Sequence, residues 1–172
     1  QTKTRADTII GGIGIAICLV LVYVPYSWKK TLDANPYIHD ITTDTLNPPD
    51  FVVVEELRSA EEHSIEYDGL EVAELQRRAY PELKTLVLEG DIESMIKLAE
   101  DVLNDMDLEV VSVEPAAGRV EAVATTWLFG FQDDMVIRLK AIDGAKVEVD
   151  VRSKSRVGRS DLGQNAKRIR QF

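Results

Sequence analysis

The stretch Asp91–Met106, "DIESMIKLAEDVLNDM", has the strongest helical pattern in this chain and leads directly into four segments with β-strand character. Its apolar residues recur at spacings of three and four, which is the period of one helix face. Asp91 and Glu93 suit the positive end of a helix dipole. The apolar positions are Ile92, Met95, Ile96, Ala99, Val102, Leu103 and Met106. The stretch therefore predicts an amphipathic helix next to a sheet.

The four β segments that follow are rich in valine and aromatic residues and are joined by turn-forming sequences. The first connection is "EPAAGR" and the third is "DGA", both typical of hairpins. In the last segment, valines alternate with charged residues, which predicts an antiparallel sheet with one solvated face. Trp127, Phe129 and Phe131 would share one face of their strand. The segments are Leu108–Val113, Arg119–Phe131, Met135–Ile142 and Lys146–Arg152.

Shorter elements are expected before Asp91. Prolines with Asp, Asn and Thr favour extended and turn conformations in the segment after the N-terminal helix. We expect a linker over Thr31–Asp50, a short strand over Phe51–Val54, a loop over Arg58–Gly69, a helix over Leu70–Tyr80 and a buried strand over Thr85–Leu88.

The run Ile9–Val24 has no charge, and a bilayer core is crossed by about 20 apolar residues. Trp28 can lie at headgroup level, and Lys29 and Lys30 just beyond it. The sequence "YVPYSWKK" after the run is too bulky for a signal-peptide cleavage site. A core helix would show a polar face. We therefore predict a single transmembrane helix, with Ile9, Val24, Trp28, Lys29 and Lys30 as anchor residues.

The surroundings of this helix bear on its partner and its orientation. Gly11, Gly12 and Gly14 make one side thin enough for another helix to approach, so they permit the integral membrane protein partner that we expect. Two basic residues precede the helix and two follow it, so the positive-inside rule gives a tie. A short tail before a lone anchor usually stays in the cytoplasm. We therefore expect the domain on the periplasmic or lumenal side of a bacterial inner membrane or an organellar equivalent.

The fold class follows from these elements and from the 172-residue length, which fits one domain plus an accessory segment. We predict an α+β protein with one N-terminal transmembrane helix and an antiparallel sheet of about four to five strands packed by two or three helices. The expected parts are the tail and membrane helix over residues 1–30, the linker over 31–50 and the soluble domain over 51–172.

Charge is unevenly distributed along the chain, whose formal net charge is −10. Asp33–Glu114 has 22 acidic and 5 basic residues, whereas Val151–Phe172 has 7 basic residues and 1 acidic residue. The acidic balance disfavours nucleic-acid binding. The opposite charges of the two regions indicate either internal pairing in the folded domain or a basic site for an external anion.

The basic region contains "RSKSRVGRSDLGQNAKRIR" at Arg152–Arg170, where a helix can begin at Ser160-Asp161. Free N–H groups at a helix start and arginine donors attract anions. Candidate anion-binding residues are Ser153, Ser155, Arg156, Arg159 and Ser160. The alternative is an internal network formed by Asp133, Asp134, Arg138, Arg152, Asp161 and Asn165.

Catalytic and metal motifs are weak. Asp133 and Asp134 are adjacent, so in a strand they would point to opposite faces, and in a turn they are ordinary turn formers. His39, Asp40 and Asp44 are too few to define a metal site, and turn hydrogen bonds from the two Asp side chains explain them more simply. The sequence contains no GxSxG, Walker or GxGxxG motif. We expect no metal, no cofactor and no catalytic residues.

The chain resembles the domain-of-unknown-function-1499 family of bacterial and plastid proteins. The residues that carry the resemblance are "HDITTDTLNPPDF" at His39–Phe51, "AYP" at Ala79–Pro81, "EAVATTWLFGFQDDMVIR" at Glu121–Arg138 and "VDVRSKSRVGRSDLGQNAKRIR" at Val149–Arg170. The resemblance implies a shared fold over most of the soluble part and supplies no mechanism.

Three hypotheses for function follow. The first is a membrane-anchored, non-enzymatic accessory or scaffolding subunit of a larger membrane complex. The second is a domain that binds an anionic small molecule or lipid headgroup through the C-terminal Arg/Ser/Gly loop. The third is a hydrolase that uses Asp133 or Asp134 with Arg138, which the missing motifs make the weakest of the three.

Overall fold

The computed structural model describes residues 2–142 and 145–172. The chain divides into two compact units, residues 1–35 and residues 36–172. The connection "DGA" includes residues 143 and 144 and so lies partly outside the described residues.

The first unit is one helix, α1 (Thr2–Ala34), which contains all five predicted anchor residues. Its segment Asp7–Ala34 is long and apolar enough to cross a membrane. At 1.5 Å per residue this segment extends about 42 Å, more than the roughly 30 Å of a bilayer core. The helix continues past residue 30, where we expected it to end. Its length and composition fit a membrane span and also a signal sequence.

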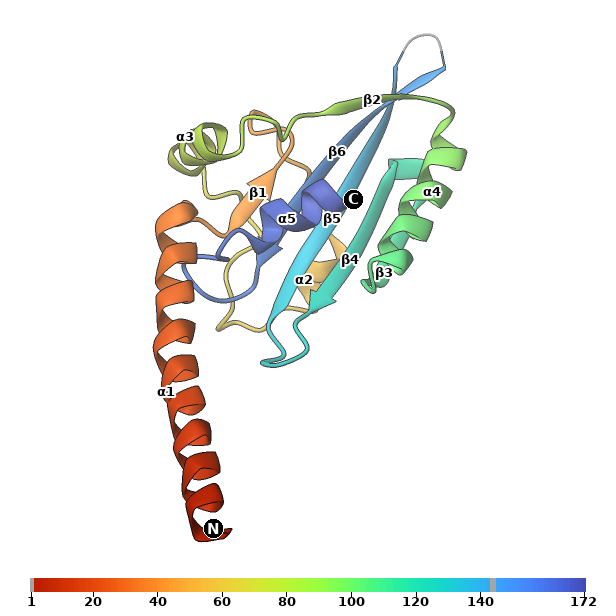
Figure 1. Ribbon diagram of the computed structural model, residues 1–172. Coiled ribbons are helices and arrows are strands. Elements are labelled where there is room, and N and C mark those ends of the chain that lie inside the picture. Colours follow the sequence, from red (N-terminus) through yellow and green to blue (C-terminus); the bar gives the residue numbers. More distant parts are fainter. Residues whose placement is uncertain (1, 143–144) are drawn as a thin grey trace. The chain divides into compact units, whose positions relative to one another are not determined.

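The second unit is built on one antiparallel sheet with the order β1-β6-β5-β4-β3 (Figure 1). Strand β2 also pairs with β6, near the start of β6, whereas β1 pairs near its end. The strands are β1 (Asp40–Thr42), β2 (Leu86–Glu89), β3 (Glu109–Glu114), β4 (Arg119–Thr125), β5 (Gln132–Ile142) and β6 (Lys146–Ser155). The α+β class is confirmed, with six strands among the described residues instead of four to five.

The helices of this unit lie on both faces of the sheet, with α4 and α5 on one face and α2 on the other (Figure 1). The predicted helix after Asp91 is confirmed, and the Asp91 side chain caps it by accepting the N–H of Ser94. The helices are α2 (Val53–Glu56), α3 (Leu70–Ala79), α4 (Ile92–Asp105) and α5 (Gln164–Gln171), with a 3₁₀ turn η1 (Pro115–Ala117).

The main hydrophobic core lies between the sheet and the pair α4 and α5. Leu103 of α4 and Ile169 of α5 pack against alternate residues of the central strands. The strand residues in this core include Val120, Ala122, Met135, Ile137, Leu139, Val147, Val149 and Val151. The predicted apolar face of the sheet is therefore present, and we call it the apolar face.

The segment expected to be a linker contributes to the compact unit. Strand β1 pairs with β6, and Ile41 is fully buried. The other edge of β1 is held by Gln76 of α3, which accepts the N–H of Thr42 and donates to its carbonyl. A three-residue strand is too short to give a recognisable alternation in a sequence rich in Asp, Thr and Pro.

Of two predictions about short strands, one was wrong and the other was wrong in part. The segment Phe51–Val54 enters helix α2 and forms no strand. The strand expected at Thr85–Leu88 exists as β2, but all four of its residues are exposed. It is an edge strand, which pairs with β6 alone among the described residues.

The strand expected to run from Arg119 to Phe131 ends at Thr125. Residues 127–129 form a turn, so Trp127 and Phe129 lie outside the sheet. The next strand begins earlier than predicted and contains Asp133 and Asp134, both buried. Interpretation of these two residues as turn formers was therefore wrong, because the turn uses Gly130 in a left-handed conformation instead.

Candidate functional site

The second face of the sheet is covered with charged side chains, and we call it the charged face. It contains Asp150 and Arg152 of β6, which we expected to meet solvent, together with Lys154 and Arg156 further along the same segment. They are instead largely buried under residues 43–68, which include α2. Its ion pairs join six bases (Arg58, Arg119, Arg138, Arg152, Lys154 and Arg156) to six acids (Asp40, Asp44, Asp68, Glu121, Asp134 and Asp150).

Arg152 lies at the centre of the charged face and is only 2% exposed. Its Nε and Nη2 donate to the two carboxylate oxygens of Asp40 at 2.9 and 2.8 Å. Nη1 donates to the carbonyl oxygen of Pro49, and Nη2 also donates to that of Ile65. The guanidinium lies over the ring of Phe51, with its Cζ 4.8 Å from the ring centroid. A buried charge is tolerated only when it is paired and hydrogen-bonded, and Arg152 meets both conditions.

Lys154 is the neighbouring base on β6 and is also buried. Its Nζ lies 3.2 Å from Asp40 and 2.7 Å from Asp68, and it donates to the carbonyl of Glu66. Strand β1 and the loop before α3 thus supply the acceptors of this ammonium, Asp40, Glu66 and Asp68. Tyr67 lies in the same loop, and burial together with nearby Asp40 raises the pKa of its hydroxyl to about 12.

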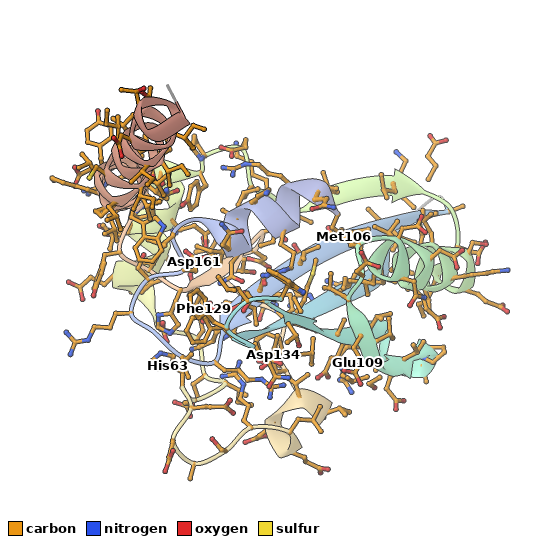
Figure 2. All side chains as sticks on the ribbon, turned by 60° about the horizontal axis from the view of Figure 1, so that its bottom comes forward. His63, Met106, Glu109, Phe129, Asp134 and Asp161 are labelled. Atoms are coloured by element: carbon orange, nitrogen blue, oxygen red, sulfur yellow. The ribbon has the colours of Figure 1, made fainter. Side chains whose placement is uncertain are left out.

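Asp134 of β5, labelled in Figure 2, is fully buried and binds two arginines from different segments. Arg156 donates to it from Nε and from Nη2, the latter at 2.8 Å, and Arg58 approaches it at 2.6 Å. Arg156 uses Nη1 for the carbonyl of Leu57 and the side chain of Gln132. The donors of Arg156 are therefore directed at internal acceptors and away from any external anion.

Glu121 explains why α2 is a helix. Its carboxylate accepts the backbone N–H groups of Val52, Val53 and Val54. These are the unsatisfied donors of the first helical turn, and a carboxylate there is favoured by the helix dipole. Arg119 lies 3.0 Å from the same carboxylate and balances its charge. The signal for this cap lies almost 70 residues away from α2 in the sequence.

A second polar network lies on the apolar face, where β6 meets α5. Ser153 donates to the side-chain oxygen of Asn165, whose nitrogen donates to Ser155 and to the carbonyl of His39. Arg168 donates to Ser153 and to Asp133. Asp133 and Asp134 therefore bind different arginines on opposite faces of the sheet, as adjacent strand residues must.

The start of α5 differs from the predicted start at Ser160-Asp161. The helix begins after Gly163, and the Asp161 carboxylate accepts the N–H groups of Gly163 and Asn165. Burial raises the pKa of Asp161, while these two hydrogen bonds act to lower it. The donors that an external anion would use are thus occupied by Asp161.

The five candidate anion-binding residues do not form one site. Ser153 and Ser155 belong to the network with Asn165, and Arg156 belongs to the charged face. Ser160 accepts the N–H of Leu162. Arg159 is exposed, and no ion pair to it is found among the described residues. Of the predicted network residues, Arg138 pairs with Asp44 and Asp150 at 3.0 and 2.8 Å.

Two histidines from distant segments lie together at the edge of the charged face. The rings of His39 and His63 have centroids 4.2 Å apart, and His63 Nε2 is 2.9 Å from the carbonyl oxygen of Gly158. Burial lowers the pKa of His39, and nearby Asp68 only partly offsets this effect. The sequence contained no signal for this contact, because the two residues lie in segments without periodicity.

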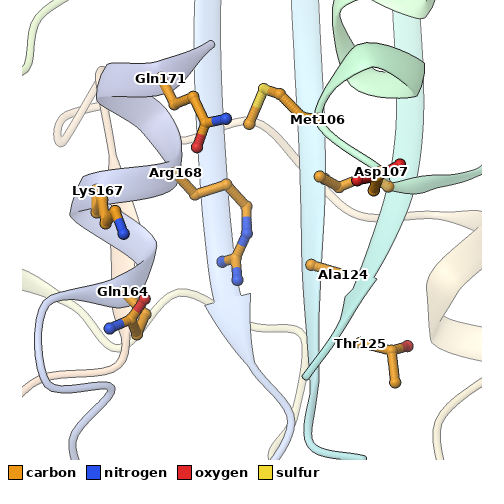
Figure 3. Close-up of a pocket in the computed structure, with 9 residues that line it drawn as sticks. Met106, Asp107, Ala124, Thr125, Gln164, Lys167, Arg168 and Gln171 are labelled. Atoms are coloured by element: carbon orange, nitrogen blue, oxygen red, sulfur yellow. The ribbon is translucent and has the colours of Figure 1, made fainter. Parts of the chain in front are cut away.

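A polar cleft of about 220 Å³ lies between α5 and the β3–β4 side of the sheet (Figure 3). Helix α5 contributes Gln164, Lys167, Arg168 and Gln171 to it, as Figure 3 shows. The opposite wall is formed by Met106, Asp107, Leu108, Ala124 and Thr125. The cleft combines two bases with one acid, and it gives no signal in the sequence because its walls come from separate elements.

These features define an α+β domain with one apolar and one charged sheet face, preceded in the chain by a candidate membrane helix. The model of a family described as a protein of unknown function (DUF1499) matches residues 40–172. The chain therefore belongs to this family, as the quoted motifs indicated. No curated protein matches it.

Proposed function

We propose that this chain is a membrane-anchored, non-enzymatic domain that acts as an accessory or scaffolding subunit of a larger membrane protein complex. The observation that carries the proposal is the pairing of its buried bases with internal carboxylates, typified by Arg152 with Asp40 and by Arg156 with Asp134. Such pairs fix the geometry of the domain and leave its outer surface for contacts. The apolar helix Asp7–Ala34 supplies the means of attachment.

Co-purification tests this proposal. The tagged full chain, extracted from native membranes in a mild detergent, is expected to bring down a stoichiometric integral membrane partner. The matched control is the same tag on an unrelated single-span protein, which identifies proteins that bind the tag or the detergent micelle. A chain that elutes alone, at the mass of the protein and its micelle, would contradict the proposal.

The alternative is that the C-terminal segment binds an anionic small molecule or headgroup. The cleft beside α5 favours this alternative, because Lys167 and Arg168 both line it. Titration with inorganic phosphate should then show saturable binding that Lys167→Ala or Gln171→Ala, both at residues that line the cleft, weakens. Lys97→Ala, on the exposed side of α4, is the control and should bind normally. Unchanged binding in the first two variants would remove this alternative.

The hydrolase hypothesis has the weakest geometric support. Its carboxylates, Asp133 and Asp134, lie on opposite faces and are each bound by arginines. Arg138, its proposed partner, instead contacts Asp44 and Asp150. Full function of an Asp134→Asn variant that still folds would eliminate this hypothesis.

A further inference from the structure

The tip of the β4–β5 hairpin presents an apolar cluster to solvent. It consists of the sequence "TWLFGF" at Thr126–Phe131. Trp127 has the highest fractional exposure of the large apolar residues that the structure describes. The exposed fractions are 95% for Trp127, 67% for Leu128, 63% for Phe129 and 53% for Phe131. Contiguous exposed apolar side chains of this size mark an interaction surface.

The turn itself holds this cluster in place. The N–H of Thr126 donates to the carbonyl of Phe131 at 2.8 Å, and Gly130 N–H donates back to the carbonyl of Thr126 at 2.9 Å. The Thr126 hydroxyl accepts the N–H of Phe131. The rings of Phe129 and Phe131 stack with their centroids 5.6 Å apart. The apolar side chains are therefore displayed by a hydrogen-bonded turn at the end of two long strands.

The chemistry of the tip fits a lipid interface. No residue from Thr126 to Gln132 is charged. The nearest acids, Asp133 and Asp134, are paired with arginines within the domain. The tip can therefore leave water without stripping the solvent from an unpaired charge. The indole of Trp127 is apolar with one N–H donor, the combination that is enriched at headgroup level.

The covalent structure keeps a membrane within reach. Only residues 35–39 join the end of α1 to the start of β1. Five residues span at most about 18 Å when fully extended. Any bilayer that holds α1 is therefore joined to the domain by a short covalent connection. Because the tip projects as a narrow wedge of four side chains, it suits insertion between headgroups better than it suits a broad protein interface.

We propose that the hairpin tip, residues 126–131, inserts Trp127, Leu128 and Phe129 into the headgroup–acyl boundary of the membrane that anchors this chain. The proposal goes beyond the accessory role and does not depend on it, because pure lipid is sufficient for the contact. The hairpin would act as a second membrane attachment point that restricts rotation of the domain about its anchor.

The test uses the fluorescence of Trp127 in the full chain. The sequence has two tryptophans, so Trp28→Phe makes Trp127 the sole indole. The protein is reconstituted into phosphatidylcholine–phosphatidylglycerol vesicles, with and without bromine on the acyl chains. We expect blue-shifted emission, protection from acrylamide, and loss of emission in the brominated vesicles.

Ala117 provides the matched control position. It is exposed and precedes β4, at the opposite end of that strand from the tip. The seven residues of β4 place the two positions roughly 24 Å apart. In the triple variant Trp28→Phe, Trp127→Phe, Ala117→Trp, emission should stay red-shifted, sensitive to acrylamide and unaffected by bromine. The urea midpoints of both variants should match that of the unmodified chain.

Three results would overturn the proposal. The first is water-exposed Trp127 in vesicles, with the same emission as tryptophan at position 117. The second is equal loss of emission at both positions in brominated vesicles, which would mean non-specific contact of the domain with lipid. The third is Trp127 exposed in vesicles but shielded in native membranes, which would assign the tip to a protein partner.

Discussion

The two faces of the sheet are buried by different means. The apolar face packs against α4 and α5 through aliphatic side chains such as Leu103 and Ile137. The charged face is covered by residues 43–68, and its centre consists of ion pairs beside a small apolar cluster of Phe51, Val54 and Val136. A strand that alternates apolar and charged residues can therefore be buried on both faces when another segment supplies the counter-charges.

The two faces should respond differently to substitution. Apolar burial is nondirectional and roughly proportional to area, so it tolerates changes that preserve volume. Buried ion pairs gain little over a well-packed apolar substitute, but the loss of one partner leaves an uncompensated charge. The charged face should therefore depend on the identity of each group, whereas the apolar face should depend mainly on volume.

The largest effect is expected for Asp134→Ala. This change leaves both Arg58 and Arg156 buried without their carboxylate. It should lower the free energy of unfolding by about 3–5 kcal/mol. Urea unfolding of the full chain in mild detergent measures this change. Asp50→Ala, an exposed acid before α2, is the control and should shift stability by less than about 0.5 kcal/mol. Equal effects of the two changes would mean that the pairing of Asp134 does not stabilise the domain.

A smaller effect distinguishes charge from shape. Arg156→Lys keeps the charge but loses the planar set of donors to Asp134, Leu57 and Gln132. It should cost about 1–3 kcal/mol, because buried acceptors remain unsatisfied. Leu103→Met on the apolar face conserves volume and should cost less than about 1.5 kcal/mol. A larger cost for Leu103→Met than for Arg156→Lys in the same unfolding assay would contradict the proposed contrast.

The pH dependence of stability tests the edge of the charged face. Burial lowers the pKa of His39 from its usual 6.5, with His63 and Lys154 adding to the effect and Asp68 and Asp40 opposing it. The unfolded chain therefore binds a proton more readily than the folded one, and stability should fall as pH drops through 6.5 toward the folded pKa. The urea midpoint measured from about pH 7.5 to 5.5 should fall less in His39→Gln. An unchanged slope in this variant would show that His39 makes no contribution.

The smallest effect is expected for Arg159→Ala. Arg159 is exposed in the loop before α5 and forms no ion pair among the described residues. Its replacement should change the free energy of unfolding by no more than about 0.5 kcal/mol. A loss comparable to that of Asp134→Ala would place Arg159 in the internal network, contrary to its exposure.

Elements long enough to repeat their apolar pattern several times were predictable from the sequence. Helix α4 shows four turns of regular apolar spacing, and the fold class followed from it and the β segments. The strand boundaries near the hairpin tip were not predictable. Trp127 and Phe131 have high β propensity but lie outside the strands, whereas Asp133 and Asp134 have low β propensity but lie inside one. In the structure, tertiary ion pairs outweigh those preferences, and the aspartates lie inside β5.

The ion pairs of the charged face could be predicted only as one of two possibilities. The charge asymmetry between Asp33–Glu114 and the C-terminal segment indicated internal pairing or an anion site. The acceptors of Arg152, however, come from residues 40, 49 and 65, and two of them are backbone carbonyls. Backbone carbonyls carry no sequence signal, so the choice required the three-dimensional arrangement.

A double-mutant cycle on Asp134 and Arg156 tests the central claim most directly, namely that the C-terminal arginines stabilise the fold through internal carboxylates. The free energy of unfolding is measured for the unmodified chain, Asp134→Ala, Arg156→Ala and the double variant. The contact between the two side chains predicts that the double variant loses less than the sum of the single losses, by a coupling energy of about 1–3 kcal/mol. Single losses that add to within about 0.5 kcal/mol would contradict the claim.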